Sequence, residues 1–546
     1  MLKLVAGMIG VGVDELVRRD AQRAVRRMTK VAIAAVAGMA TMAVLTFMAV
    51  ESRNEAQRQR AQAEDLIEFM LGDLRRKLVP VGRLDVLDSL GAKALAYYAA
   101  EDPDRFDADS LARRSHAQRL IGEIREQRGK LDEALTAFQS AADTTAALLA
   151  RAPGDGQRIF DHAQSVYWVG YIAWRRGQAR SAEESFLKYR ELAQRLVRID
   201  PANVDWQLET AYASQNLGVA QLDRAHSAEA LLSFSESRSV LARLVRARPE
   251  LSTDLAENHG WTARALEAGG DFDGAVAQQL QRLAVLRSSP DAVADRQVQQ
   301  QMANADAALS RLLLSLHDLK AAEEHARAST DRTDGLVASD PDNMFWLSES
   351  SFSRMGLAEV EYESGKRALA HADSERLAPS ISRLLASDAS AMNWHMNLRG
   401  RALSLRARIA LAEGRQVAID AIDGYLADVH GFESLGIQPN ADETTIVASV
   451  EMTLGDLLDR SGKPEVAVRH WRAAAARVRP LAERDNYAAI TLLARAQLRL
   501  GQPVEARSLA ARVQTSRYRH PAYADLVSEL AQVAGLAQSD AGSKGK

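Results

Sequence analysis

The feature that most constrains this chain is a set of four residues that recurs at constant spacing. The first set is Gly122, Gly129, Ala134 and Phe138, whose members follow Gly122 by 7, 12 and 16 residues. The set returns 48 residues later, then after a further 48, and again beyond residue 450. The later sets are Gly170, Gly177, Ala182 and Phe186; Gly218, Ala225, Ala230 and Phe234; and Gly455, Gly462, Ala467 and Trp471. Such repetition predicts a row of stacked copies of one small unit, because 546 residues are too many for a single compact core.

An antiparallel pair of helices explains each position of the set. The two helices approach closely where they cross, so Gly or Ala is expected at the first position. A glycine at the second position can adopt the left-handed conformation that ends a helix. The aromatic residue at the fourth position fills the space between neighbouring repeats. These offsets resemble those of the tetratricopeptide repeat (TPR) family from about residue 110 to 530, and the resemblance implies an all-α solenoid of helix-turn-helix units.

The period of this chain differs from that of the family. Tetratricopeptide repeats run at about 34 residues, so a period of 48 leaves about 14 extra, or about two more turns on each helix. We predict about nine long repeats over residues 110–535, with weak members near 311–326 and 402–420. The pattern Asp-Pro-x-Asn-x-x-Trp at 200–206 and 340–346 marks two junctions, and Trp394 lies 48 residues beyond the second tryptophan. The proline is expected to end one helix and the asparagine to cap the next, where the tryptophan packs the new helix on the old one.

A single apolar run precedes the repeats. Residues 31–50 carry no charge, and at about 1.5 Å per residue they span roughly the 30 Å of a bilayer core. More positive charges precede this run than follow it, so the N-terminus is predicted to be cytoplasmic and the repeats to lie across the membrane, in a periplasm or an equivalent space. The six that precede it are Arg18, Arg19, Arg23, Arg26, Arg27 and Lys30, and the three that follow within twenty residues are Arg53, Arg58 and Arg60. A buried core helix and a cleaved signal peptide are the alternatives, but the run is longer than the usual apolar region of a signal peptide.

These observations divide the chain into five segments. Residues 1–30 form a basic cytoplasmic segment and residues 31–50 a single transmembrane helix. Residues 51–109 form a helical stalk and capping region, and residues 110–535 the TPR-like α-solenoid. Residues 536–546 are expected to be a disordered tail, because they are rich in Gly, Ser and Lys. The predicted location is therefore the inner (plasma) membrane, as a single-pass protein.

Composition excludes several classes of function. The 69 Lys and Arg nearly balance the 72 Asp and Glu, so no strong positive field attracts nucleic acid. The chain has no cysteine, which removes disulfides, thiolate zinc sites, iron–sulfur clusters and cysteine nucleophiles.

Three short motifs suggest chemistry, but each has a plainer interpretation. The phosphate-loop-like sequence at 461–464 lacks the Ser or Thr and the upstream glycine, and the calcium-loop-like sequence at 271–274 has no closing glutamate, so both are predicted to be turns. The sequence Glu323-Glu324-His325 is interpreted as a solvated helix face. We therefore predict no catalytic, cofactor-binding or metal-binding residue, no cofactor, and no enzymatic activity.

One aromatic constellation could contact a ligand. Tyr167, Tyr171 and Trp174 lie at i, i+4 and i+7 of a first helix, on the face that lines the groove in repeats of this type. An aromatic stripe at helical spacing is more often packing, so the three residues are not assigned to a site.

Three stretches, at 66–98, 160–178 and 200–206, resemble the C-terminal half of bacterial signalling proteins in which a cytoplasmic effector joins a transmembrane helix and a repeat array. In those proteins the effector is often a Toll/interleukin-receptor-like (TIR) domain, or a nucleotide cyclase or kinase. Thirty residues before the apolar run are too few for an effector, so that activity is not expected here. The chain is predicted to be a membrane-anchored scaffold or sensor that holds a protein or peptide on its concave surface, with a separately encoded cytoplasmic effector as a further partner. The alternative is the truncated half of an effector-coupled enzyme, a TIR-type NAD hydrolase or a nucleotide cyclase, whose start has been lost or misassigned.

Overall fold

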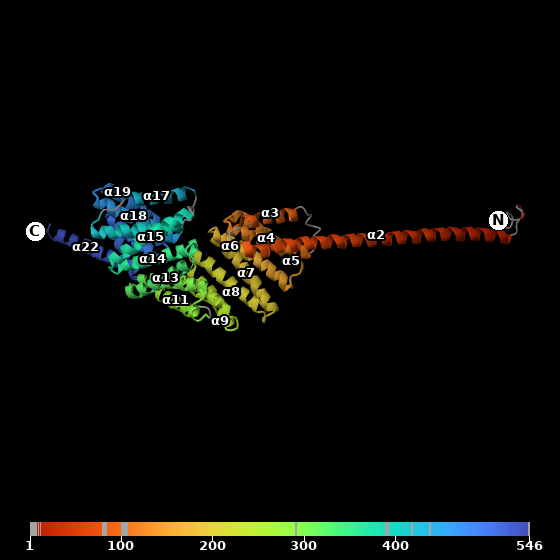
Figure 1. The fold of residues 1–546 in the computed structure, drawn as a ribbon, viewed down its shortest axis with the longest axis horizontal. Coiled ribbons are helices and arrows are strands. Elements are labelled where there is room, and N and C mark those ends of the chain that lie inside the picture. Colours follow the sequence, from red (N-terminus) through yellow and green to blue (C-terminus); the bar gives the residue numbers. More distant parts are fainter. Residues whose placement is uncertain are drawn as a thin grey trace. The chain divides into compact units, whose positions relative to one another are not determined.

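The computed structural model describes Met8, Gly10 and residues 13–78, 84–99, 108–289, 292–387, 393–415, 419–435 and 438–543, and this part of the chain contains helices and no strand (Figure 1). The prediction of an all-α solenoid is confirmed. The helices before the repeats are α2 (Val13–Leu78) and α3 (Leu84–Ala99). The first helices of the repeats are α4 (Ala108–Gln127), α6 (Gly156–Arg175), α8 (Val204–Asp223), α10 (Ser252–Ala268), α12 (Arg296–Ser315), α14 (Met344–Glu363), α16 (Gly400–Glu413), α18 (Ala441–Arg460) and α20 (Tyr487–Arg499). The second helices are α5 (Leu131–Arg151), α7 (Ala179–Ile199), α9 (Ser227–Leu244), α11 (Phe272–Arg287), α13 (Leu319–Ser339), α15 (Arg367–Ser387), α17 (Ile419–Ser434), α19 (Pro464–Ala482) and α21 (Pro503–Gln514). A short 3-10 turn η3 (Pro249–Leu251), a π-helical segment η4 (Asn393–Arg399) and the last helix α22 (Pro521–Ser543) complete the described part.

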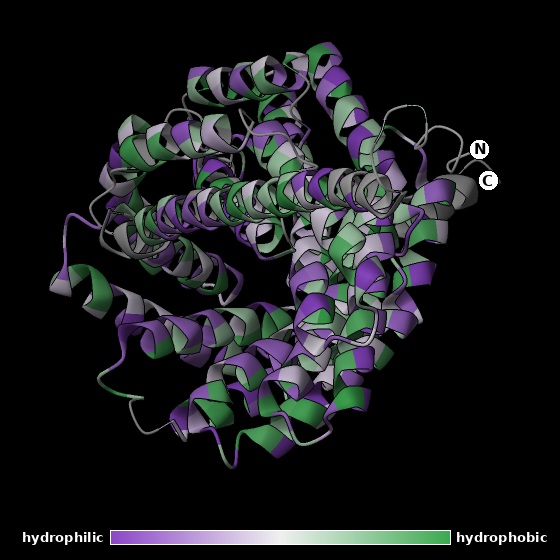
Figure 2. Cartoon of the chain, turned by 90° about the vertical axis from the view of Figure 1, so that its right-hand side faces the viewer, coloured by the Kyte–Doolittle hydropathy of each residue, from purple (hydrophilic) through white to green (hydrophobic). Residues whose placement is uncertain are grey.

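The helices from α4 to α21 form nine consecutive pairs in the described residues, in agreement with the predicted number of repeats. Most of them have 16 to 21 residues, as the long period requires, whereas the last pair has 13 and 12. Hydrophilic and hydrophobic residues alternate around the helices, which is expected where one side packs and the other meets solvent (Figure 2). The chain divides into two compact units, residues 1–172 and residues 173–546.

The repeated glycine is required where the two helices of a pair cross. A Cβ atom added to Gly218 would lie 2.6 Å from Cε1 of Phe234, and one added to Gly122 would lie 2.6 Å from the same atom of Phe138. The rings of both phenylalanines are fully buried. Phe138 also stacks on Trp168 of the following repeat, with ring centroids 4.9 Å apart, so the predicted packing between neighbouring repeats is confirmed there.

The turns between paired helices use the predicted left-handed conformation. Glycines at this position in seven repeats have φ between 69° and 82°, and they are Gly129, Gly177, Gly270, Gly365, Gly414, Gly462 and Gly501. Ala225 and His317 hold φ values of 62° and 66° at the equivalent turns, where a side chain is disfavoured. The junctions also follow expectation, because Asn203 caps α8 by accepting from the backbone N–H of Trp206 and Asn343 caps α14 in the same way.

The first unit begins with α2, a single helix of 66 residues (Figure 1). Its segment Val25–Glu55 is the one helix of the described residues that is long and apolar enough to cross a membrane, and it is not buried against the rest of the protein. Further along, Glu64 and Ile67 are buried where α2 meets α3 and α4, and Arg113 donates to Glu64 at 2.6 Å. The stalk is therefore solvated at its start and packed at its end.

The second unit closes on itself through its C-terminal end. The rings of Tyr518 and Phe272 lie 5.8 Å apart, and Tyr487 stacks on Tyr518 with centroids 6.1 Å apart. The backbone N–H of Arg519 donates to the carbonyl of Ser315 at 2.6 Å. These contacts join the end of the chain to the fourth and fifth repeats in one apolar cluster, which the repeat pattern did not predict.

Two local interpretations differ from the structure. The segment expected to be a disordered tail is helical as far as Ser543, because α22 continues through it, and residues 544–546 lie outside the described part. The interpretation of Glu323-Glu324-His325 as a solvated face was wrong for two of the three residues. His325 contacts the buried Asp306 at 2.8 Å, and Glu323 accepts from Lys366, whereas Glu324 is exposed. Packing of α13 between its neighbours buries this face.

Candidate binding site

One cavity of the second unit is lined by the first helices of consecutive repeats. It has a volume of about 670 Å³ and is formed by α14, α16, α18 and α20, by the start of α22 and by the segment before it. We call it the large cavity. Its volume is in the range of ordinary ligand sites. The sequence predicted that a protein or peptide binds on the concave surface of the solenoid, and that location stays a prediction.

The lining of the large cavity is about half polar and half apolar, and its polar part carries both charges. Hydroxyl groups come from α18 and α20, through Thr445, Ser449, Thr453 and Thr491. Arg408, Arg460, Arg495 and Arg499 supply positive charge, and Asp456, Asp459 and Asp525 supply negative charge. Hydrogen-bond donors and acceptors, together with charges of both signs, suit the backbone and side chains of a peptide better than a single small ion.

Ion pairs link the first helices to one another across the repeats. Nε and Nη2 of Arg401 donate to the carboxylate of Glu359, at 2.9 and 2.6 Å. Arg408 donates to Glu363 at 2.6 Å. Arg499 contacts Asp456 at 3.2 Å. Arg408 and Arg499 line the large cavity, and partners in neighbouring repeats hold their side chains in place, so these charges of the cavity wall are preorganised.

Residues 515–520, between α21 and α22, are called the closing segment below. Burial changes the pKa of two groups in or near this segment. It lowers the pKa of His520, and it raises the pKa of Asp525 with help from the charge of Glu363. His520 stacks on Tyr518 with centroids 5.9 Å apart. The rim of the cavity therefore favours a neutral imidazole.

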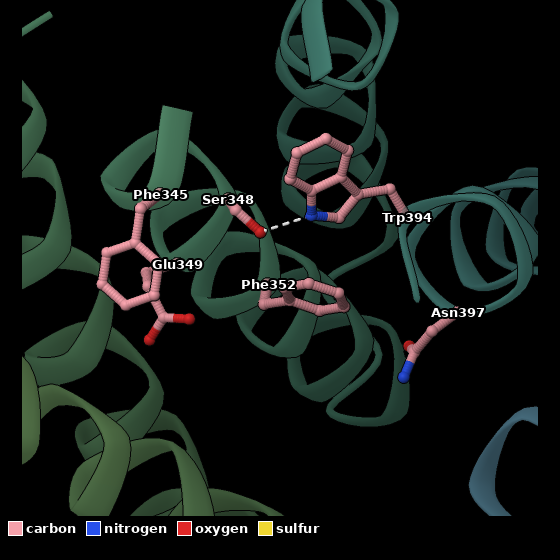
Figure 3. A pocket seen from close by; sticks show the side chains of 6 residues that line it. All are labelled: Phe345, Ser348, Glu349, Phe352, Trp394 and Asn397. Atoms are coloured by element: carbon pink, nitrogen blue, oxygen red, sulfur yellow. Dashed lines mark hydrogen bonds between the residues drawn. The ribbon is translucent and has the colours of Figure 1, made fainter. Parts of the chain in front are cut away.

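A second pocket, of about 570 Å³, opens between α14 and η4 (Figure 3). We call it the aromatic pocket. Its lining residues are Phe345, Ser348, Glu349, Phe352, Trp394 and Asn397. Trp394 donates from Nε1 to the hydroxyl oxygen of Ser348 at 2.7 Å, which fixes the indole over one side of the pocket. Figure 3 shows Phe345 next to the carboxylate of Glu349, and Phe352 between Glu349 and Trp394.

The three aromatic residues singled out in the sequence have structural contacts. Tyr167 and Tyr171 are half-buried in the first unit, with ring centroids 6.1 Å apart, and both contact Trp168. In the second unit, Trp174 packs against the cluster around Phe234 and donates to Asp223 at 2.7 Å. Packing accounts for these contacts, as the plainer interpretation of the stripe expected.

The sequence did not indicate a binding role for the residues that line the two cavities, although Trp394 of the aromatic pocket stood out at a predicted junction. A spacing of 42 to 45 residues between glutamate and arginine, as in Glu359–Arg401 and Glu363–Arg408, is the pattern that could have predicted ion pairs between the first helices, and Arg408 of the second pair lines the large cavity. The described residues contain no group of three or more His, Asp or Glu placed to hold a metal ion.

No protein-family model and no curated protein matches the sequence. Solved structures that resemble it include the apo form of RapI, 10% identical over 77% of this chain and 99% of that one, with a TM-score of 0.49. The apo form of the quorum sensor NprR from B. thuringiensis is 10% identical over 78% and 99%, with a TM-score of 0.44. A Rap protein in complex with competence and sporulation factor is 12% identical over 77% and 99%, with a TM-score of 0.42. At these identities the likeness concerns the helical-repeat fold alone.

Proposed function

We propose that this protein is a membrane-anchored binding module whose large cavity holds a segment of a peptide or protein partner, and that it performs no catalysis of its own. The observation that carries the proposal is the lining of that cavity. Paired arginines and carboxylates, together with four hydroxyl groups, face a space of about 670 Å³ on the first helices. A peptide presents alternating donors, acceptors and charges, which this wall can match.

Rigidity of the wall supports a binding role over mere packing. Arg408 and Arg499 of the wall are each held by a carboxylate of the preceding repeat, Glu363 and Asp456, so little side-chain entropy is lost when a ligand is bound. The backbone of the closing segment is tied to α12 through Arg519 and Ser315. A partner therefore meets a preformed surface.

The proposed placement in the cell rests on the apolar segment of α2. We assign residues 31–50 to the plasma membrane, residues 1–30 to the cytoplasm and the repeats to the periplasmic side, because arginines are concentrated before the apolar run. Proteolysis of C-terminally tagged protein in intact and lysed spheroplasts tests this topology. Cleavage of the repeats in intact spheroplasts is expected, and cleavage after lysis alone would place the partner in the cytoplasm.

Photocrosslinking in living cells tests the binding role. A benzophenone amino acid in place of Thr445 would face the large cavity. The control is the same benzophenone amino acid in place of the exposed Leu369 of α15. A discrete adduct from position 445 and none from 369 is expected. A bulky substitution in the cavity, Ser449→Trp, should abolish the adduct, whereas Ser382→Trp on the exposed face of α15 should not. The proposal fails if position 445 gives no specific adduct, or if Ser449→Trp leaves the adduct unchanged in a folded protein.

A further inference from the structure

Helix α14 carries four glutamates, and one of them differs from the other three. Each of the three pairs with an arginine of another helix: Glu359 with Arg401 at 2.6 Å, Glu361 with Arg327 at 2.7 Å and Glu363 with Arg408 at 2.6 Å. Glu349 accepts hydrogen bonds from Gln300 and Asn304 of α12, and no ion pair joins it to a basic side chain in the described part of the chain. The amides supply donors but no positive charge.

The ion pair between Glu363 and Arg408 is the kind of contact that Glu349 does not make in the described part of the chain. The guanidinium of Arg408 contacts Glu363 and also lies over the ring of Tyr362, 4.4 Å from its centroid. Arg408 follows Glu363 by 45 residues. The residue 45 positions after Glu349 is Trp394, so an aromatic ring occurs where the other pair has its arginine.

Beside Glu349 there is room for a guanidinium. The aromatic pocket of about 570 Å³ is lined by Glu349 together with Phe345, Phe352 and Trp394 (Figure 3). Phe345 is 54% exposed, so its ring is accessible from solvent. A planar guanidinium can pair with a carboxylate and stack on aromatic rings at the same time.

We propose that the aromatic pocket binds the guanidinium of an arginine side chain supplied by the partner, with Glu349 as its counter-ion and the rings of Phe345, Phe352 and Trp394 as its walls. The pocket then reproduces, with a ligand, the contact that Arg408 makes within the chain. Burial raises the pKa of Glu349, which is consistent with a carboxylate whose cation is absent. This assignment names a residue of the partner and so rests on the proposed function.

Calorimetric titration of the full chain with N-acetyl-arginine amide tests the assignment without a peptide partner. Saturable binding is expected, and N-acetyl-citrulline amide, which has the same shape without the charge, should bind at least about tenfold more weakly. Glu349→Gln keeps the size of the side chain and should weaken binding of the arginine probe by at least about tenfold. Phe345→Leu keeps an apolar side chain without the aromatic face and should weaken it by about two- to fivefold. Glu324→Gln, which removes an exposed glutamate of α13, is the matched control and should change nothing.

Several results would overturn the assignment. It is wrong if the arginine probe does not saturate, if citrulline binds as tightly as arginine, or if Glu349→Gln binds like the unmodified chain while its thermal unfolding is unchanged. Tighter binding of tetramethylammonium than of the arginine probe would identify a site for quaternary ammonium groups instead. A specific crosslink at Thr445 would persist in each of these cases, so failure here is distinguishable from failure of the proposed function.

Discussion

Replacement of Gly218 by alanine tests whether the repeated glycine is required by helix crossing. In α8 the new Cβ would lie 2.6 Å from Cε1 and 2.8 Å from Cδ1 of Phe234. Such distances are well inside van der Waals contact. The ring of Phe234 is fully buried, so it cannot move into solvent, and the helices α8 and α9 must separate or the ring must leave its rotamer.

The sign of the effect is the informative quantity. Alanine in place of glycine within a helix ordinarily stabilises a protein by about 0.5–1 kcal/mol. Overpacking of a buried crossing costs about 1–3 kcal/mol, so we expect Gly218→Ala to lower the free energy of unfolding by about 1–2 kcal/mol net. Gly356 lies in α14 with open space at its Cβ position, and Gly356→Ala should raise the free energy of unfolding by about 0.5–1 kcal/mol.

Urea unfolding followed by circular dichroism gives the two free energies, and hydrogen exchange of the backbone amides shows whether the loss is confined to α8 and α9. The double variant Gly218→Ala/Phe234→Leu supplies a coupling energy, because leucine lacks the ring atoms that clash. We expect the glycine substitution to be less harmful in the leucine background. If Gly218→Ala stabilises the protein as much as Gly356→Ala does, the crossing argument is refuted.

Three further predictions concern the turns, the closing segment and pH. Ala225→Gly should stabilise the protein by about 0.5–1 kcal/mol in the same unfolding assay, because φ is 62° there and glycine removes the strain of its side chain; a destabilised variant would contradict this. Tyr518→Ala should destabilise the second unit by about 3–5 kcal/mol and speed hydrogen exchange around Phe272, whereas unchanged exchange in α11 would exclude the closure contact. Because burial lowers the pKa of His520, the folded state favours the neutral imidazole, so its stabilising contribution is present above the ordinary pKa near 6.5 and is lost as the pH falls below it. The melting temperature should therefore fall less on acidification in His520→Asn than in the unmodified chain, and identical falls would count against this role of His520.

Local features of the fold followed from short stretches of sequence. The spacing of Gly122 and Phe138 predicted a close helix crossing at a Gly or Ala, and the structure places the ring of Phe138 against Gly122. The pattern around Asn203 predicted a helix start, and its side chain caps α8 there. Both arguments needed one repeat and its neighbour, because steric and capping interactions act over a few ångströms.

Longer-range features were beyond such reasoning. Glu323 and His325 were interpreted as solvated, but Glu323 pairs with Lys366 and His325 contacts Asp306, because α13 packs between other helices. The aromatic pocket around Glu349 combines residues of different repeats, and no motif in the sequence brings them together. Glu349 has no ion-pair partner in the described part of the chain, and this difference can be recognised only when the partners of the other glutamates of α14 are known.

The sequence by itself determined the repeating unit, its length, the position of its turns and the apolar segment before it, since each depends on residues close together in the chain. The tertiary structure alone decided that the last repeats return to Phe272 and that the first helices enclose a charged cavity. Small rotations between successive repeats accumulate along a solenoid, and they set which distant residues meet. The sequence of a single repeat therefore does not determine which distant residues meet.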